Sequence, residues 1–346
     1  MANILDIRRR IRSVINTRQI TKAMKMISAA RLRRAQERAL NARPYAQMLI
    51  NVLRSLVSRA EVYDPETGQP RHPLLARREE RNILVVVVTG DRGLAGAFNT
   101  NILKAAMRFL ESKAGKNIDI EVVGRKGRDF LRRRFPTASA EDSARRGPVQ
   151  IVGEHIEVLN KLEFEYVREF AERIIDRYTR EEIDALYLLF NEFKSVIAQR
   201  LVVDEVLPIA EIGERAIKHA EEMDQEARAR AVEAAKGAGV GLREADTSEM
   251  DRRAAQFGTA RVDYIYEQPP GELFRGLLPK YVAVQIYRAL LESGAAEHAA
   301  RMTAMDSATN NASDMIDSLT LAMNRVRQAK ITKEIIEIVS GAAAAG

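Results

Sequence analysis

The sequence predicts an α/β protein in which two long terminal helices pair as an antiparallel coiled coil around a central globular domain. Three observations lead to this fold class. Gly and Pro, which interrupt helices, are sparse at both ends: residues 1–67 contain no Gly, and after Pro279 the stretch to residue 340 contains only Gly294. Apolar residues at both ends recur at spacings of three and four. Between the ends, β-branched runs alternate with helical stretches, which favours a mostly parallel sheet.

Composition and charge narrow the class of protein. The 346-residue chain contains no Cys, which excludes a disulfide framework and Cys-ligated metal sites. No apolar run approaches the roughly 18 residues of a membrane helix, and no apolar segment follows the N-terminal arginines as in a secretory signal. Residues 1–60 hold fourteen Lys and Arg against two Asp and Glu, although the whole chain carries only +7. Such a basic helix predicts an acidic surface, nucleic acid or anionic lipid as partner.

The first element is an N-terminal coiled-coil helix over residues 1–60, followed by a linker over residues 61–81. Its apolar residues recur in two stripes, which are Ile4, Ile7, Ile11 and Val14, and then Ile20, Met24 and Ile27. Stripes this lean do not stabilise a helix alone. We therefore expect them to pack against the other end of the chain.

The middle of the chain is predicted to form the α/β domain, over residues 82–210. The predicted strands are Ile83–Thr89, Ile118–Val123, Val149–Val152, Ala185–Phe190 and Arg200–Leu207, and the helices are residues 100–111, Lys126–Arg134 and Glu154–Tyr178. Ile83–Thr89 is continuously apolar, as in a strand buried on both faces. Residues 211–258 are predicted to be a charged helical insertion, with the helix over Glu211–Lys236.

The last segment, residues 259–346, is predicted to hold a final strand at Val262–Tyr266 and then the C-terminal coiled-coil helix. Its apolar stripe follows 4-3 spacings through Met305, Thr309, Ala312, Ile316, Leu319, Met323 and Val326. That repeat is typical of a left-handed coiled coil. Since a domain separates the two helices in the chain, an antiparallel pair is the simplest arrangement. The alternative is two ordinary amphipathic helices packed on the domain.

No residue pattern indicates a catalytic, cofactor or metal site. The loop Gly90–Asn99 follows a buried strand and opens a helix, where a phosphate-binding loop would lie. It has neither the G-x-x-x-x-G-K-[ST] nor the G-x-G-x-x-G spacing, so we expect no nucleotide there. The four His residues lie in separate segments without metal-ligand spacing. An α/β enzyme with helical arms and a basic coiled-coil binder of nucleic acid remain as alternatives.

Four segments resemble a known family. They are residues 17–36 (TRQITKAMKMISAARLRRAQ), 297–312 (EHAARMTAMDSATNNA), 324–341 (NRVRQAKITKEIIEIVSG) and 91–101 (DRGLAGAFNTN). Together they resemble the gamma subunit of F-type, proton-translocating ATP synthases, and the resemblance covers almost all of the chain except about 211–258. Photosynthetic members carry an insertion there with a regulatory Cys pair, which this chain lacks.

The resemblance implies a Rossmann-like central domain without nucleotide and a role as the rotor shaft of the complex. Such a shaft transmits torque between the proton-driven c-ring and the catalytic alpha/beta ring, and is itself not an enzyme. The implied partners are the alpha and beta subunits, the epsilon subunit and the c-ring, with one copy per complex and no nucleic acid. The implied location is the cytoplasmic face of the bacterial plasma membrane, as a peripheral part of the complex.

The same resemblance assigns subunit-interface and coupling roles to nine residues. They are Met24, Lys25, Arg92, Ala95, Arg301, Arg327, Gln328, Thr332 and Glu337. Met24 matches a position near the acidic loop of beta, and Arg92 and Ala95 match the loop that faces beta. Arg327 and Gln328 match hydrogen-bond donors to the surrounding ring. Each could instead be an ordinary seam or surface residue.

Overall fold

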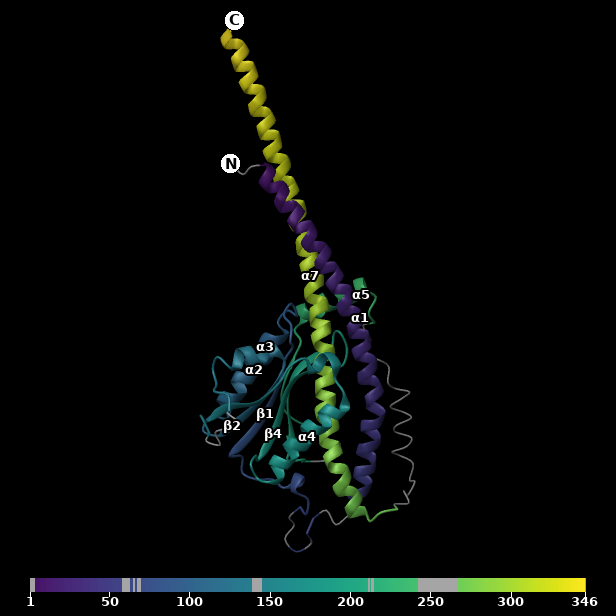
Figure 1. Cartoon of the computed structure of the whole chain (residues 1–346). Coiled ribbons are helices and arrows are strands. Elements are labelled where there is room, and N and C mark those ends of the chain that lie inside the picture. Colours follow the sequence, from purple (N-terminus) through teal and green to yellow (C-terminus); the bar gives the residue numbers. More distant parts are fainter. Residues whose placement is uncertain are drawn as a thin grey trace.

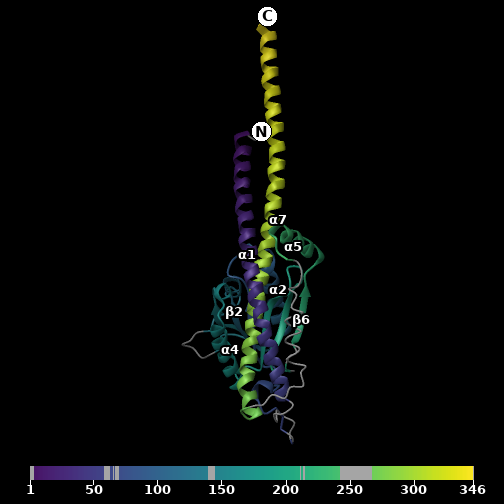
Figure 2. The same ribbon diagram turned by 90° about the vertical axis from the view of Figure 1, so that its right-hand side faces the viewer.

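Two long helices lie side by side along an α/β domain and project beyond it (Figure 1). The computed structural model describes residues 4–57, 63–64, 66, 70–138, 145–210, 212, 215–241 and 267–345. Helix α1 spans Ile4–Val57 and helix α7 spans Pro270–Ala345. Both chain ends lie at the same end of the molecule, so the helices run antiparallel (Figure 2). This confirms the predicted pairing of the two ends.

The helices differ in length, and α7 extends past the start of α1 (Figure 2). With 54 and 76 residues, they span about 80 Å and 110 Å at 1.5 Å per residue. Each has one proline in its interior, Pro44 and Pro279, in the part that lies along the domain, and α7 also begins with Pro270. Proline removes a helical hydrogen bond, so the projecting parts keep an unbroken hydrogen-bond ladder. Helix α7 begins at Pro270, within the segment 259–346 predicted to hold the C-terminal helix.

The sheet has six strands within the described residues, in the order β3-β2-β1-β4-β5-β6. The parallel strands are β1 (Asn82–Val88), β2 (Asn117–Val123), β3 (Val149–His155) and β4 (Ala185–Phe193). The antiparallel strands are β5 (Gln199–Leu207) and β6 (Ala216–Glu222). The predicted, mostly parallel α/β sheet is confirmed, and β6 adds an edge that the sequence analysis did not anticipate.

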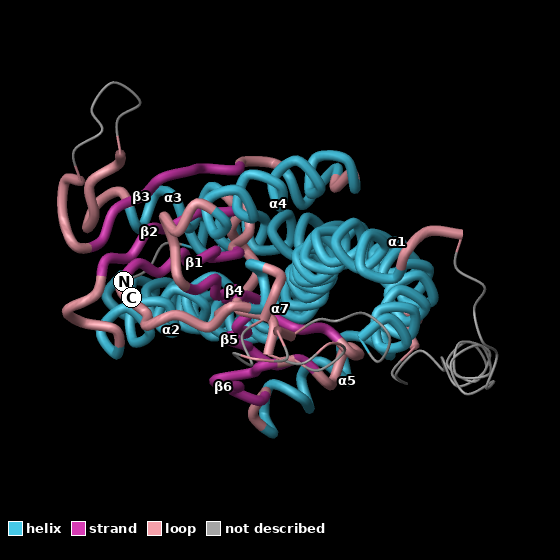
Figure 3. The backbone as a smooth tube through the Cα atoms, turned by 90° about the horizontal axis from the view of Figure 1, so that it is seen from below, coloured by secondary structure: helices cyan, strands magenta, loops and turns pink. Residues whose placement is uncertain are grey.

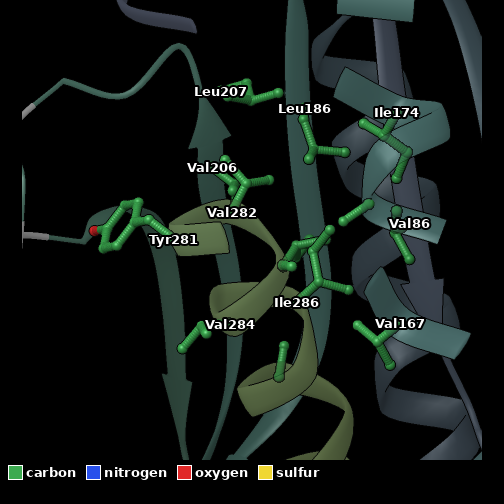
Figure 4. Close-up of a cluster of buried hydrophobic side chains, with 14 of the residues drawn as sticks. Val86, Val167, Ile174, Leu186, Val206, Leu207, Tyr281, Val282, Val284 and Ile286 are labelled. Carbon is green, nitrogen blue, oxygen red and sulfur yellow. The ribbon is translucent and has the colours of Figure 1, made fainter. Parts of the chain in front are cut away.

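Helices cover both faces of this sheet (Figure 3). Helices α2 (Phe98–Ser112) and α3 (Arg125–Leu131) cover one face, while α4 (Phe164–Thr179) and α7 cover the other. Successive strand residues point to opposite faces, so Val85 packs towards α2, and Val86 towards α4 and α7. Figure 4 shows Val86 with Val167 of α4 and Ile286 of α7. Burial on both faces explains why β1 is continuously apolar.

Two predicted helices are wrong in part. The helix predicted over Glu154–Tyr178 begins only at Phe164, because β3 continues to His155 and the short 3-10 helix η2 (Val158–Lys161) follows. Glu157 lies between them with a left-handed φ of 65°, which interrupts a helix. A further 3-10 turn, η1 (Pro73–Leu75), precedes β1.

The predicted helix over Glu211–Lys236 is also wrong at its start, where residues 216–222 form edge strand β6. Charged side chains are common on exposed edge strands because they discourage pairing with other chains. Among the described residues of this segment, only α5 (Gln225–Ala238) is helical, with the Asp224 carboxylate accepting a capping hydrogen bond from the Ala227 backbone N–H at 2.6 Å. The strand predicted at Val262–Tyr266 lies outside the described residues.

The seam of the coiled coil departs from the predicted stripe on α1. The heptad repeat that Ile7 begins continues through Thr21, Lys25, Ser28 and Leu32, all of them buried. The predicted second stripe is wrong, since Ile20 and Ile27 are 60% and 55% exposed. On α7 the predicted stripe is buried or half-buried throughout, from Met305 to Val326. Polar residues in the seam of α1 therefore meet α7, while neighbouring apolar residues face outward.

Candidate functional site

Four segments meet where the paired helices leave the α/β domain, and we call this junction the neck. It comprises residues 21–35 of α1, the loop 89–97, helix α5, and residues 293–309 of α7. Its apolar cluster is rich in alanine, with members Ala29, Leu32, Ala95, Phe98, Ala231, Ala234, Ala235, Ala238, Ala295, Ala296, Ala299 and Met302. Small side chains let backbones approach closely at close-packed density. Ala95, a predicted site residue, is buried in this cluster.

A polar layer joins α1 to α7 inside the seam of the neck. Lys25 Nζ lies 2.5 Å from Asp306 Oδ1, and both side chains are only 11% exposed. One turn further along, the hydroxyl oxygens of Thr21 and Thr309 lie 2.8 Å apart. A polar pair at a seam position specifies the register of two helices, because any shift leaves buried polar groups unpaired. The layer therefore sets how α1 and α7 align.

The loop after β1 lies against α7 through a second buried ion pair. Arg301 pairs with Glu297 one turn earlier in α7, and its guanidinium also donates to the carbonyl oxygen of Gly93 at 3.4 Å. Burial raises the pKa of the Glu297 carboxyl, although the charge and hydrogen bond of Arg301 oppose that effect. A Cβ atom on Gly90 would lie 2.8 Å from the Glu297 carboxyl carbon. Gly90 thus permits the close approach of loop and helix.

Helix α5 is bound to α1 by its C-terminal end. Arg33 Nη2 donates to the backbone carbonyl of Gly239 at 2.5 Å, and Gly239 adopts a left-handed φ of 63°. A Cβ atom on Gly237 would lie 2.6 Å from Lys25 Nζ, so α5 also lies against the seam lysine. The last carbonyls of a helix are unsatisfied and carry partial negative charge. Two cations of α1 are placed where they complement that end.

The neck fills the place where open α/β sheets usually bind ligands. That place lies outside the carboxyl ends of the strands where the strand order reverses, which here is between β1 and β4. Helix α7 packs across it, with Glu297 against Gly90, and with Arg288 Nη2 3.5 Å from the buried Glu192 of β4. Among the described residues, no group of three or more acidic or His side chains is placed to hold a metal ion.

The structure brings some of the predicted site residues together and keeps others apart. Lys25, Ala95 and Arg301 meet in the neck, and Met24 lies half-buried beside Lys25. Arg92 lies on the same loop as Ala95 and lines a cavity beside α1. The other four are exposed on α7 beyond the start of α1, about 30 Å or more along the helix from Asp306. They are Arg327, Gln328, Thr332 and Glu337.

Sequence reasoning missed several residues of the neck. Asp306, Glu297 and Arg33 each hold a buried or half-buried contact that no local pattern indicated. Asp306 directly follows the seam residue Met305. An acidic residue beside the seam, facing a basic helix, was the sequence feature that could have indicated an ion pair with α1. No sequence feature indicated the contacts of α5, because its alanines predict a helix but not what that helix packs against.

Comparisons with known proteins agree on one family. A family profile described as ATP synthase matches residues 3–345. An ATP synthase gamma chain of Solibacter usitatus is 50% identical over 345 residues, covering 100% of both chains, and one of Anaeromyxobacter sp. (strain Fw109-5) is 43% identical over 99% of both. No helix in the described ranges is long and apolar enough to cross a membrane.

Solved structures share the fold at low sequence identity. A chain of the Euglena gracilis mitochondrial ATP synthase, from a structure of its OSCP, F1 and c-ring, has a TM-score of 0.54 at 18% identity, covering 99% of this chain and 94% of that one. A chain of the Tetrahymena thermophila central stalk and c-ring structure has a TM-score of 0.51 at 20% identity, covering 84% and 99%.

Proposed function

This chain belongs to the ATP synthase gamma-chain family, and on that premise we propose that it is the central rotor shaft of an ATP synthase. In this role it transmits torque between the proton-driven c-ring and the catalytic ring of alpha and beta subunits. It couples proton flow to ATP synthesis or hydrolysis and catalyses neither reaction itself.

One observation carries this proposal, which is that α7 is a single helix from the core of the domain to its far end. Val282 and Ile286 of α7 lie in the main hydrophobic core against the sheet. Glu297 and Arg301 bind the loop after β1. Beyond Val326 the same helix continues without a partner from α1. A turning force applied to the domain therefore reaches the tip without crossing a loop.

The exposed surfaces of α7 and α1 have the chemical character expected for contacts with the alpha and beta subunits. The tip of α7 exposes Ile331, Ile335, Ile336, Ile338 and Val339, and isolated chains rarely expose so many apolar residues in one stretch unless a partner covers them. We assign this tip, with Arg327, Gln328, Thr332 and Glu337, to the alpha/beta ring. The basic face of α1, near Met24, suits acidic loops of beta. The α/β domain is assigned to the epsilon subunit and the c-ring, at the cytoplasmic face of the bacterial plasma membrane, with one copy in each complex.

Site-directed cross-linking in the assembled complex tests the proposal. The natural absence of Cys means that an introduced Cys is the only thiol of the chain. A photoreactive group on Met26→Cys, an exposed neck position, should link to alpha or beta and stop ATP-driven proton pumping. As the control, an oxidised Thr21→Cys/Thr309→Cys pair joins two parts of the same shaft and should leave pumping intact. Continued pumping by molecules linked to the ring contradicts a rotor.

A further inference from the structure

A cavity of about 580 Å³ lies beside the neck, between α1, the η2 segment and α7. Its floor is apolar and buried, formed by Leu162, Leu290 and Leu291. Its volume is within the range of small-molecule sites, roughly 300–1,000 Å³. Only Arg92 among its lining residues belongs to the loop after β1, where α/β sheets usually bind ligands; the others lie on α1, α7 and the segment 157–162.

The cavity is lined by five cationic side chains, most of which have no carboxylate partner among the described residues. Arg31, Arg34 and Arg38 lie on one face of α1, because their spacings are three and four, and Arg92 and Lys161 complete the ring. Within the described part of the chain, none of the four arginines forms an ion pair with a carboxylate. Like charges at these helical spacings repel one another, so the arrangement costs stability while the cavity is empty.

The acidic side chain in the cavity does not neutralise this charge. Glu157 lines the wall, but its carboxylate pairs with Arg125 outside the cavity at 3.1 Å. Lys161 in turn pairs with the exposed Glu163 at 3.0 Å. The arginines therefore dominate the potential inside, and guanidinium groups bind phosphate oxygens in a bidentate manner better than any other side chain.

His298 of α7 gives independent support for a missing polar partner. Its imidazole lines the cavity, and its Nδ1 atom is buried without a hydrogen-bond partner among the described residues. Burial, and then the charges of Arg301, Arg31 and Arg34, lower the pKa of this imidazole to about 4. A buried polar atom without a partner is uncommon in native proteins and calls for an explanation such as a ligand.

We propose that this cavity binds a small polyphosphate anion, held by Arg34, Arg38 and Arg92 between α1 and α7. The shared chemistry is a chain of phosphate groups, which could come from inorganic polyphosphate or from a nucleotide. Apart from His298, no described lining residue is aromatic and able to stack on a base, so the inorganic anion is the favoured source. Such a ligand joins the two helices and stabilises the neck.

Calorimetric titration of the full chain at low salt tests the proposal, with tripolyphosphate as the probe. We expect saturable binding of one anion per chain. Arg34→Gln/Arg38→Gln should weaken it at least about tenfold, because it removes two of the three guanidinium groups that would hold the anion. Arg8→Gln/Arg12→Gln is the matched control, because it removes the same charge from exposed positions of α1 far from the cavity. The control should change the Kd less than about twofold.

Imidazole NMR of the same samples supplies a site-specific readout. Tripolyphosphate should shift the resonances of His298 and leave those of His219, which is exposed on β6, unchanged. Equal weakening by both double variants would show general attraction to a basic helix and overturn the proposal, as would the absence of saturation. Tighter binding of Mg-free ATP than of tripolyphosphate would show that the ligand is a nucleotide and not an inorganic anion. Binding of an acidic peptide, with no binding of tripolyphosphate, would show that the cavity is not a polyphosphate site.

Discussion

Lys25 of α1 pairs with Asp306 of α7 at 2.5 Å, across 281 residues of chain and inside the seam of the coiled coil. An ideal coiled coil has apolar residues at such positions. The pair therefore exchanges some stability for a defined register between the two helices. The same stretches of the two helices also hold α5, through Arg33, and the loop after β1, through Arg301.

Removing one member of this pair should destabilise the chain. Lys25→Met leaves the Asp306 carboxylate nearly buried without a counter-charge, and breaking such a pair costs about 3 kcal/mol. Unfolding of the full chain in urea, followed by circular dichroism, measures the loss. Lys25→Met/Asp306→Leu is the companion variant and should return to within about 1 kcal/mol of the natural chain. Equal losses in both variants would mean that the seam does not depend on charge pairing.

Changing Met24 should affect coupling more than assembly. Met24 is half-buried beside Lys25, so Met24→Lys places a second cation next to the seam lysine and towards the acidic loop of beta that we propose as partner. We expect fewer protons pumped per ATP hydrolysed, with normal amounts of assembled complex. Met48→Lys, at an exposed position of α1 alongside the α/β domain and away from the neck, should keep the natural ratio. An unchanged ratio in Met24→Lys refutes the assigned role.

Adding a methyl group at Gly90 should loosen the loop from α7. The new Cβ would lie 2.8 Å from the Glu297 carboxyl carbon, which Arg301 holds in place. Overpacking of this kind costs about 1–3 kcal/mol. Gly93→Ala is the natural comparison, because its Cβ would meet only the end of Lys126 at 3.8 Å. Thermal unfolding should show a lower Tm for Gly90→Ala alone.

The stability of the neck should fall in mild acid because of His298. Its pKa is about 4 in the folded chain against 6.5 in the unfolded chain, so between these values the unfolded state binds more protons. Stability therefore rises with pH through this window, and falls by up to about 3 kcal/mol as the pH drops from about 6.5 to about 4. The variant His298→Gln has no imidazole and therefore lacks this pH-dependent contribution to stability. Urea unfolding at about pH 7 and about pH 5 should show a smaller difference for the variant than for the natural chain.

Much of the fold could be predicted because the spacing of apolar residues along the chain follows which side chains are buried. The continuous apolar run at residues 83–89 predicted β1, and the 4-3 repeat on α7 predicted its contact with α1. Strand β6 escaped notice because an exposed edge strand buries little, so its composition is as polar as that of a surface helix. The early end of the helix predicted from Glu154 depended on one left-handed residue, Glu157, whose backbone angle no side-chain pattern reveals.

The neck was harder to predict than the fold. Its ion pairs join residues that are distant in the chain, and a polar residue in a helix carries no sign of its partner. On α1 the apolar pattern even pointed to the wrong face, since Ile20 and Ile27 face outward while Thr21 and Lys25 fill the seam. Resemblance to a family pointed to Lys25, Ala95 and Arg301, but not to Asp306 or Glu297, which pair with Lys25 and Arg301.

The unequal lengths of α1 and α7 have a mechanical consequence. Where two packed helices run together, bending requires their interlocked side chains to slide past one another, so that length is stiff. In the part of the chain that the structure describes, residues 327–340 of α7 are exposed and lie beyond the start of α1, and long single helices are rarely straight. In the rotor that we propose, this single-helix end is an elastic element above the stiffer paired length and evens out the force between steps.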